Sequence, residues 1–79
     1  MNAQHTPGPR GEMPESFYDA VLSALLDNPT DLRAGQALWN LSGCHAPWEA
    51  CMALARVWKN EPKSGRRVAE RLWKESRNV

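Results

Sequence analysis

Apolar residues recur at spacings of three and four along most of this chain, which is the pattern of amphipathic helices. No period-two alternation and no run of β-branched residues interrupts it, so no sheet is expected. The pattern predicts helices near residues 16–27, 30–42, 47–60 and 65–77. The expected core comprises Phe17, Val21, Leu25, Leu38, Leu41, Leu54, Trp58, Leu72 and Trp73, and the first stripe is widened by Tyr18, Leu22 and Leu26. We therefore predict an all-α, small single-domain bundle of four helices.

Residues typical of helix ends separate these segments. Ser16, with Asp19 three residues later, approximates a capping box for the first helix. Thr30 is a good N-cap for the second helix, and Gly43 suits the left-handed position that follows it. Pro47 fits the first position of the third helix.

The first fifteen residues differ from the rest of the chain. They hold three prolines and two glycines without a cluster of large aliphatic side chains, so we expect residues 1–15 to be a flexible arm and residues 16–79 to be the helical domain. They also lack the apolar core of a signal peptide, and no apolar run approaches the roughly 18 residues of a membrane span. We expect a soluble cytoplasmic protein with no membrane association.

The net charge of +1 conceals an asymmetry between the two ends. Residues 1–58 carry three arginines against six acidic residues, a net charge of −3, whereas residues 59–79 carry seven Lys or Arg against three Glu, a net charge of +4. Such a basic end can meet an anionic surface. Alternatively it is a solvated helix with ion pairs at i, i+4, namely Arg66–Glu70, Glu70–Lys74 and Arg71–Glu75.

Residues 31–41 depart most from a plain packing helix. Gly35 lies in mid-segment, where it costs roughly 1 kcal/mol relative to Ala. Arg33, Gln36 and Asn40 form a polar row at helical spacing. Gly35 between Ala34 and Ala37 favours a close helix crossing, and the alternative is that Gly35 and the polar row form a binding face.

Four tryptophans are many for 79 residues. Trp58 and Trp73 lie on apolar stripes and are assigned to the core, whereas Trp39 lies beside the polar row and Trp48 at a helix start. Exposed Trp near Arg is typical of protein interfaces. The candidate partner-binding residues are therefore Arg33, Gln36, Trp39, Asn40, Arg66, Arg67, Arg71 and Lys74.

Metal binding and catalysis find little support in the residues. Cys44, His45, Cys51 and His5 show none of the short ligand pairs of zinc sites, and Cys51 fits a small core residue. Neighbouring Cys44 and His45 are poorly placed as nucleophile and base. No paired carboxylates or Gly-rich phosphate loop stand out, so we expect no enzyme, no metal and no cofactor.

The segment from Asp31 to Asn40, with the pattern L-R-x-G-Q-A-L-x-N, resembles short, mostly uncharacterised proteins of phages, prophages and plasmids. Their similar segment follows a helix that ends in N-P or H-P, as Asn28-Pro29 does here. The resemblance covers about residues 17–42 and departs at Leu41-Ser42-Gly43, and the C-terminal half has no counterpart. It implies a mobile-element origin and, by analogy, an inhibitor or adaptor that acts on a host complex, including anti-CRISPR and other anti-defence proteins.

Three hypotheses follow. The first is a protein-binding module that acts on a host protein or ribonucleoprotein complex in the host cytoplasm. The second is a nucleic-acid-associated accessory protein that uses the basic C-terminal helix for phosphate contacts. The third is a virion or assembly protein with a symmetric apolar interface. The sequence ranks them in this order and leaves the oligomeric state open.

Overall fold

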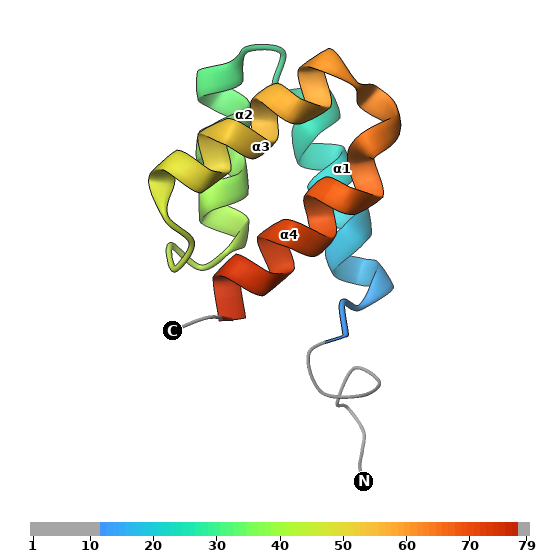
Figure 1. The fold of residues 1–79 in the computed structure, drawn as a ribbon, viewed down its shortest axis with the longest axis vertical. Coiled ribbons are helices and arrows are strands. Elements are labelled where there is room, and N and C mark those ends of the chain that lie inside the picture. The colour runs from blue at the N-terminus through green and yellow to red at the C-terminus, as the bar shows by residue number, and fades with distance from the viewer. Residues whose placement is uncertain (1–11, 78–79) are drawn as a thin grey trace, which may run out of the picture.

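The computed structural model describes residues 12–77, which form four α-helices and no strand (Figure 1). Helix α1 spans Glu15–Asp27, α2 spans Asp31–Leu41, α3 spans Trp48–Asn60 and α4 spans Gly65–Arg77. A short 3-10 helix, η2 (Pro62–Ser64), leads directly into α4. The predicted all-α class and the four helices are confirmed. Of the predicted flexible arm, residues 1–11 lie outside the described residues.

The helices form two layers, with α3 and α4 in front of α2 and α1 in the view of Figure 1. Helix α2 packs most extensively on α3, α1 contacts both α2 and α4, and α4 closes the bundle against α3. Each helix therefore lies between two neighbours, and for α1 this agrees with the broad apolar face that the sequence predicted.

The core contains more small residues than predicted. Four of the nine expected core residues are fully buried, namely Val21, Leu25, Leu38 and Leu72. The other five, Phe17, Leu41, Leu54, Trp58 and Trp73, are half-buried. The other buried hydrophobic residues are Ala34, Ala46, Cys51, Ala55, Val68 and Ala69. Leu26 does not widen the packed face of α1, since 70 % of its surface is exposed. The buried core therefore combines leucines and valines with alanines and Cys51, and the aromatic side chains of Phe17, Trp58 and Trp73 are only half-buried.

Two of the predicted helix starts are wrong by one residue. Helix α1 begins at Glu15 and its N-cap is Pro14, with no side-chain cap, so Ser16 and Asp19 form no capping box. The Pro14 carbonyl accepts from the Phe17 amide at 3.1 Å. Met13 packs against the core, so the prediction that the flexible arm reaches residue 15 is wrong for this residue. Likewise Pro47 is the N-cap of α3 and not its first helical residue. In both cases an extended proline precedes the helix because its fixed φ also suits the extended region.

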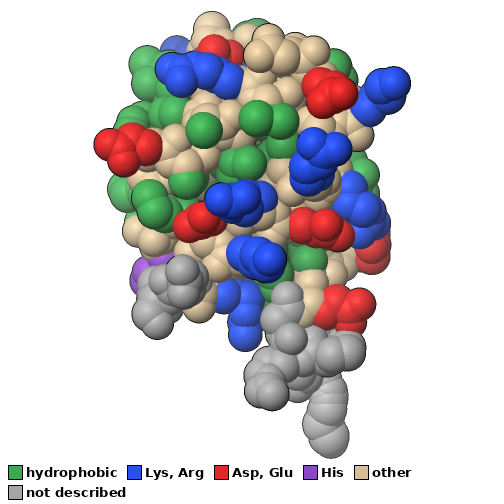
Figure 2. All heavy atoms as spheres, in the orientation of Figure 1, with side chains coloured by type: hydrophobic (Ala, Val, Ile, Leu, Met, Phe, Trp, Pro, Cys, Tyr) green, Lys and Arg blue, Asp and Glu red, His purple; other side chains and the backbone are tan. Residues whose placement is uncertain are grey.

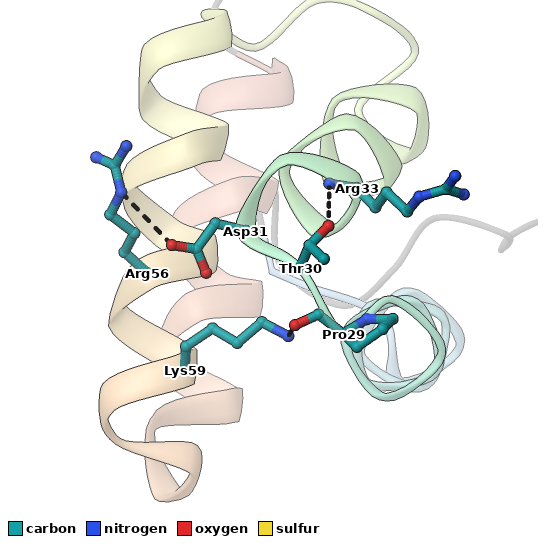
Figure 3. Close-up of polar contacts among 6 residues, drawn as sticks. All are labelled: Pro29, Thr30, Asp31, Arg33, Arg56 and Lys59. Carbon is teal, nitrogen blue, oxygen red and sulfur yellow. Dashed lines mark hydrogen bonds and ion pairs between the residues drawn. The ribbon is translucent and has the colours of Figure 1, made fainter.

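The two ends of α2 follow the prediction. Thr30 is the N-cap, and its hydroxyl accepts from the Arg33 amide at 3.2 Å (Figure 3). Gly43 adopts φ +71° after the helix, and its amide donates to the Asn40 carbonyl at 3.0 Å. Cys44 also lies in the left-handed region, with φ +66°. Two successive left-handed residues turn the chain back toward α3.

The helices are too short for a bilayer. In the part of the chain that the structure describes, no helix combines the length and hydropathy that crossing a membrane requires.

Candidate functional site

Helices α2 and α3 pack antiparallel. Contacts between them recur about every four residues, advancing along α2 and going back along α3. At its start, the Lys59 ammonium donates to the carbonyls of Asn28 and Pro29 at 2.9 and 2.6 Å (Figure 3). One turn on, Asp31 faces Arg56 with 3.7 Å between Oδ2 and Nε. Next along the helices comes the contact of Gly35 with Met52, and at the far end lies the ring contact of Trp39 with Trp48.

The Gly35 contact explains why this helix tolerates a glycine in its middle. Gly35 is buried, and a Cβ atom there would collide with the Met52 sulfur and lie 3.4 Å from the Met52 Cα. The backbones of α2 and α3 therefore approach closely at this point. The close helix crossing predicted for Gly35 is confirmed.

The polar row of α2 lies on the opposite side from this interface. Arg33, Gln36 and Asn40 are exposed, and the Arg33 side chain extends away from α3 (Figure 3). Trp39 is half-buried, and its ring centroid lies 5.9 Å from that of Trp48 in an edge-to-face arrangement. Trp48 is the more exposed of the two, at 40 %. The row therefore presents its polar groups on the exposed side of α2.

The basic residues of α4 instead border a hollow between α4 and the start of α1. The cavity has a volume of about 450 Å³. It is lined by Glu12, Met13, Glu15, Arg66, Arg67, Glu70, Arg71, Trp73 and Lys74. All four basic residues proposed from the sequence thus come together at one site, with Trp73 in its wall. Figure 2 shows Lys and Arg side chains following α4 across the face of the molecule, with acidic side chains between them.

The four basic residues have different roles in the fold. Arg66 Nη2 lies 3.0 Å from Glu15 Oε2, and its guanidinium stacks 4.4 Å from the Tyr18 ring centroid. A weaker contact to Glu70 measures 3.9 Å. The hydrogen bond with Glu15 raises the pKa of Arg66, the neighbouring negative charges add to this, and partial desolvation opposes it. Arg66 therefore ties α4 to α1, and its charge is compensated within the molecule.

The other three cations are more available. Arg71 pairs with Glu75 at 3.3 Å, and two-thirds of the Arg71 side chain stays exposed. Arg67 and Lys74 are exposed and make no hydrogen bond or ion pair with another residue in the range 12–77. We call Arg67, Arg71 and Lys74 the basic row. Their spacing of four and three residues puts them on one face of α4.

Trp73 is the aromatic group of the hollow, but it is firmly held. Its ring lies edge-on to Phe17, with 5.0 Å between centroids, and the Arg77 guanidinium lies 5.0 Å from its centroid. Trp73 is half-buried. It offers a fixed apolar wall rather than a side chain that could insert into a partner.

The cysteines and histidine lie apart from this hollow. Cys51 is fully buried, and burial raises the pKa of its thiol to about 11, with a further contribution from the negative charge of Glu75. Cys44 and His45 are exposed in the α2–α3 turn. Within residues 12–77, no three His, Cys, Asp or Glu side chains are grouped as a metal site would require, and His5 lies outside that range.

The sequence did not reveal two parts of this surface. It placed residues 12–15 in a flexible arm, although Glu12, Met13 and Glu15 form one wall of the hollow. From α3 it named only Leu54 and Trp58 as core residues and did not predict that Ala53 and Val57 are exposed on the outside of that helix. The helical spacing of Ala50, Ala53 and Val57 could have indicated this second apolar face of α3. No protein-family model, curated protein or solved structure matches this chain.

Proposed function

We propose that this protein is a small, non-enzymatic protein-binding module and that α4 is its binding element. The observation that carries the proposal is the convergence of Arg67, Arg71 and Lys74 on one face beside an apolar wall. Cations on such a face steer an acidic partner and set the association rate, and a desolvated apolar contact supplies most of the affinity.

The partner class follows from the overall charge. Nucleic-acid-binding domains of this size are usually strongly basic, with a pI above about 9, whereas this chain has a pI of about 7.8. An acidic protein surface therefore fits better than a nucleic acid. Phosphate contacts by Arg67 and Lys74, which lack partners among the described residues, are the second candidate.

The biological role extends the resemblance of residues 31–41 to proteins of phages and plasmids. On that analogy the module is a stoichiometric inhibitor or adaptor, and its partner is a host complex such as a CRISPR or other defence system. This part of the proposal rests on the resemblance alone.

The test is affinity capture from bacterial lysate with quantitative mass spectrometry, after nuclease treatment and at two salt concentrations. The double variant Arg67→Glu/Arg71→Glu should stay folded, and the amount of partner that it captures should fall about tenfold or more. The matched control, Arg33→Glu/Gln36→Glu, alters the polar row of α2 and should keep the partner. If the folded α4 variant retains its partner, the charges are only a solvated face and Arg33, Gln36 and Asn40 become the candidates. A partner lost on nuclease treatment would favour nucleic acid.

A further inference from the structure

Helix α3 is apolar on two faces. Cys51 and Ala55 face the core and are fully buried. A second set, spaced i, i+3, i+4 and i+7, is Ala50, Ala53, Leu54 and Val57, which we call the apolar stripe; Ala53 and Val57 face outward, and Leu54 also packs against the core. Ala53 and Val57 are exposed, Ala50 and Leu54 are half-buried, and none of the four is charged. This is the spacing with which a helix presents an apolar face to another helix.

The apolar stripe lies beside α4 in a defined register. A Cβ atom on Gly65, at the start of α4, would lie 3.6 Å from Trp58 Nε1, at the end of α3. At the opposite end, the Glu75 carboxylate lies close enough to Cys51 to influence its thiol. The two helices therefore run antiparallel, side by side on the front of the molecule (Figure 1).

This register aligns the apolar stripe with the basic row. Because Trp58 is near Gly65 and Cys51 near Glu75, the segment 51–58 of α3 runs alongside the segment 65–75 of α4, and these segments hold Leu54 and Val57 on one side and Arg67 and Arg71 on the other. Arg71 also binds Glu75, so it lies on the side of α4 that borders α3. Figure 2 shows the result: hydrophobic side chains gather over α3, and Lys and Arg side chains run along α4 on the same face.

We infer that the apolar stripe of α3 and the basic row of α4 together form a docking surface for an amphipathic helix with acidic residues on one flank. The inference rests on the proposed function and identifies the kind of partner. The partner helix would lay its apolar face on Ala53 and Val57, and its carboxylates would meet Arg67 and Arg71. Small side chains at Ala50 and Ala53 allow a close approach of the two helix axes.

Charge argues against the two other occupants. A second copy of this chain, docked symmetrically on the same surface, would bring two basic rows together and repel. A nucleic acid would contact the basic row but would leave the apolar stripe in water. An acidic amphipathic helix satisfies both rows at once.

The experiment uses the full chain and three fluorescein-labelled 18-residue peptides in fluorescence polarisation. One peptide carries Leu at i, i+3, i+4 and i+7 with Glu on one flank. The second has the same composition in scrambled order, and the third has Lys in place of Glu. We expect the first peptide to bind at least about tenfold more tightly than the other two, since a few desolvated anchors dominate such interfaces.

Variants test separately what the apolar stripe and the basic row contribute to binding. Val57→Glu and the milder Ala53→Gln should each weaken binding of the first peptide, by about tenfold and threefold respectively, and Arg71→Glu should weaken it by about threefold to tenfold. Leu26→Glu is the matched control, because Leu26 is an exposed leucine on α1. It should leave binding unchanged within about twofold, and circular dichroism checks that every variant is folded.

The outcomes separate this inference from the proposed function. If the scrambled acidic peptide binds as tightly as the amphipathic one, the apolar stripe plays no part and the inference is wrong, while binding through the basic row stands. If no acidic peptide binds better than the Lys peptide, both are wrong. A dimer in sedimentation analysis that Val57→Glu converts to monomer, or displacement of the peptide by a 20-base-pair duplex at physiological salt, would also overturn the inference.

Discussion

The α2–α3 interface and the outer face of α4 use similar residues for opposite purposes. In the interface, the charges of Asp31 and Lys59 are matched by a cation or by carbonyls of the neighbouring segment. On α4, Arg67 and Lys74 have no such match among residues 12–77. The interface contacts fix how two helices cross, and the outer face leaves charge available to another molecule.

A residue that is unusual for its position in a helix is therefore not always a functional one. Gly35 departs most from helix propensity, and its physical reason is the close approach to Met52. The basic row breaks no local rule, because cations on an exposed helix face are ordinary. What distinguishes it is its position beside the hollow and the apolar stripe, which only the packing of α4 reveals.

Gly35→Leu tests the α2–α3 interface and should have the largest effect. The new side chain must displace Met52 and push the helices apart, which costs about 1–3 kcal/mol of unfolding free energy. Chemical denaturation monitored by circular dichroism measures it. Gly35→Ala is the control, because its gain in helix propensity of about 1 kcal/mol opposes a smaller displacement of Met52. A Gly35→Leu protein more stable than the wild type would contradict the close crossing.

Cys51 links the two regions, since it is buried in α3 and senses Glu75 of α4. Its pKa is raised to about 11 in the folded protein, compared with about 8.5 in an unfolded chain. The unfolded chain therefore loses this proton first as the pH rises. The protonated Cys51 thiol therefore contributes its full share to the free energy of unfolding below about pH 8.5, and this contribution declines as the pH rises toward 11.

Between pH 8 and 10, the wild type should consequently lose about 1–2 kcal/mol more stability than Cys51→Ala. Denaturation curves at several pH values measure the difference in slope. Thiol labelling with a chromogenic disulfide supplies the control, because exposed Cys44 should react at once and buried Cys51 only on unfolding. Parallel pH profiles for the two proteins would show that Cys51 titrates normally.

Much of the fold could be predicted from the sequence because helix periodicity and proline positions are local signals. The exact helix starts could not, since proline suits both the first helical position and the N-cap, which is where Pro14 and Pro47 lie. The small-residue core was also missed. Ala34 and Ala69 are buried because helices cross over them, and that depends on tertiary packing.

The candidate site could be predicted only in part. Helical spacing was enough to group Arg67, Arg71 and Lys74 on one face. It could not show that Arg66, which directly precedes Arg67, turns toward α1 and binds Glu15, because this contact joins distant parts of the chain. Nor could it show which apolar face of α3 remains outside, since both faces have helical spacing.

Arg66 and Arg67 give the smallest and most direct contrast, because adjacent arginines should differ in their effect on stability. Arg66→Ala removes the contacts to Glu15 and to the Tyr18 ring that join α4 to α1, and the melting temperature should fall by about 1–4 °C. Arg67→Ala removes no hydrogen bond or ion pair with a described residue, so the melting temperature should stay within about 1 °C. The effects on binding of the acidic amphipathic peptide should have the opposite order, with Arg67→Ala weakening the affinity more than Arg66→Ala. The reason is that Glu15 already compensates the charge of Arg66, so Arg66 attracts an acidic partner less. Equal thermal shifts, or weaker binding by Arg66→Ala alone, would show that the internal pairing of Arg66 does not separate the two roles.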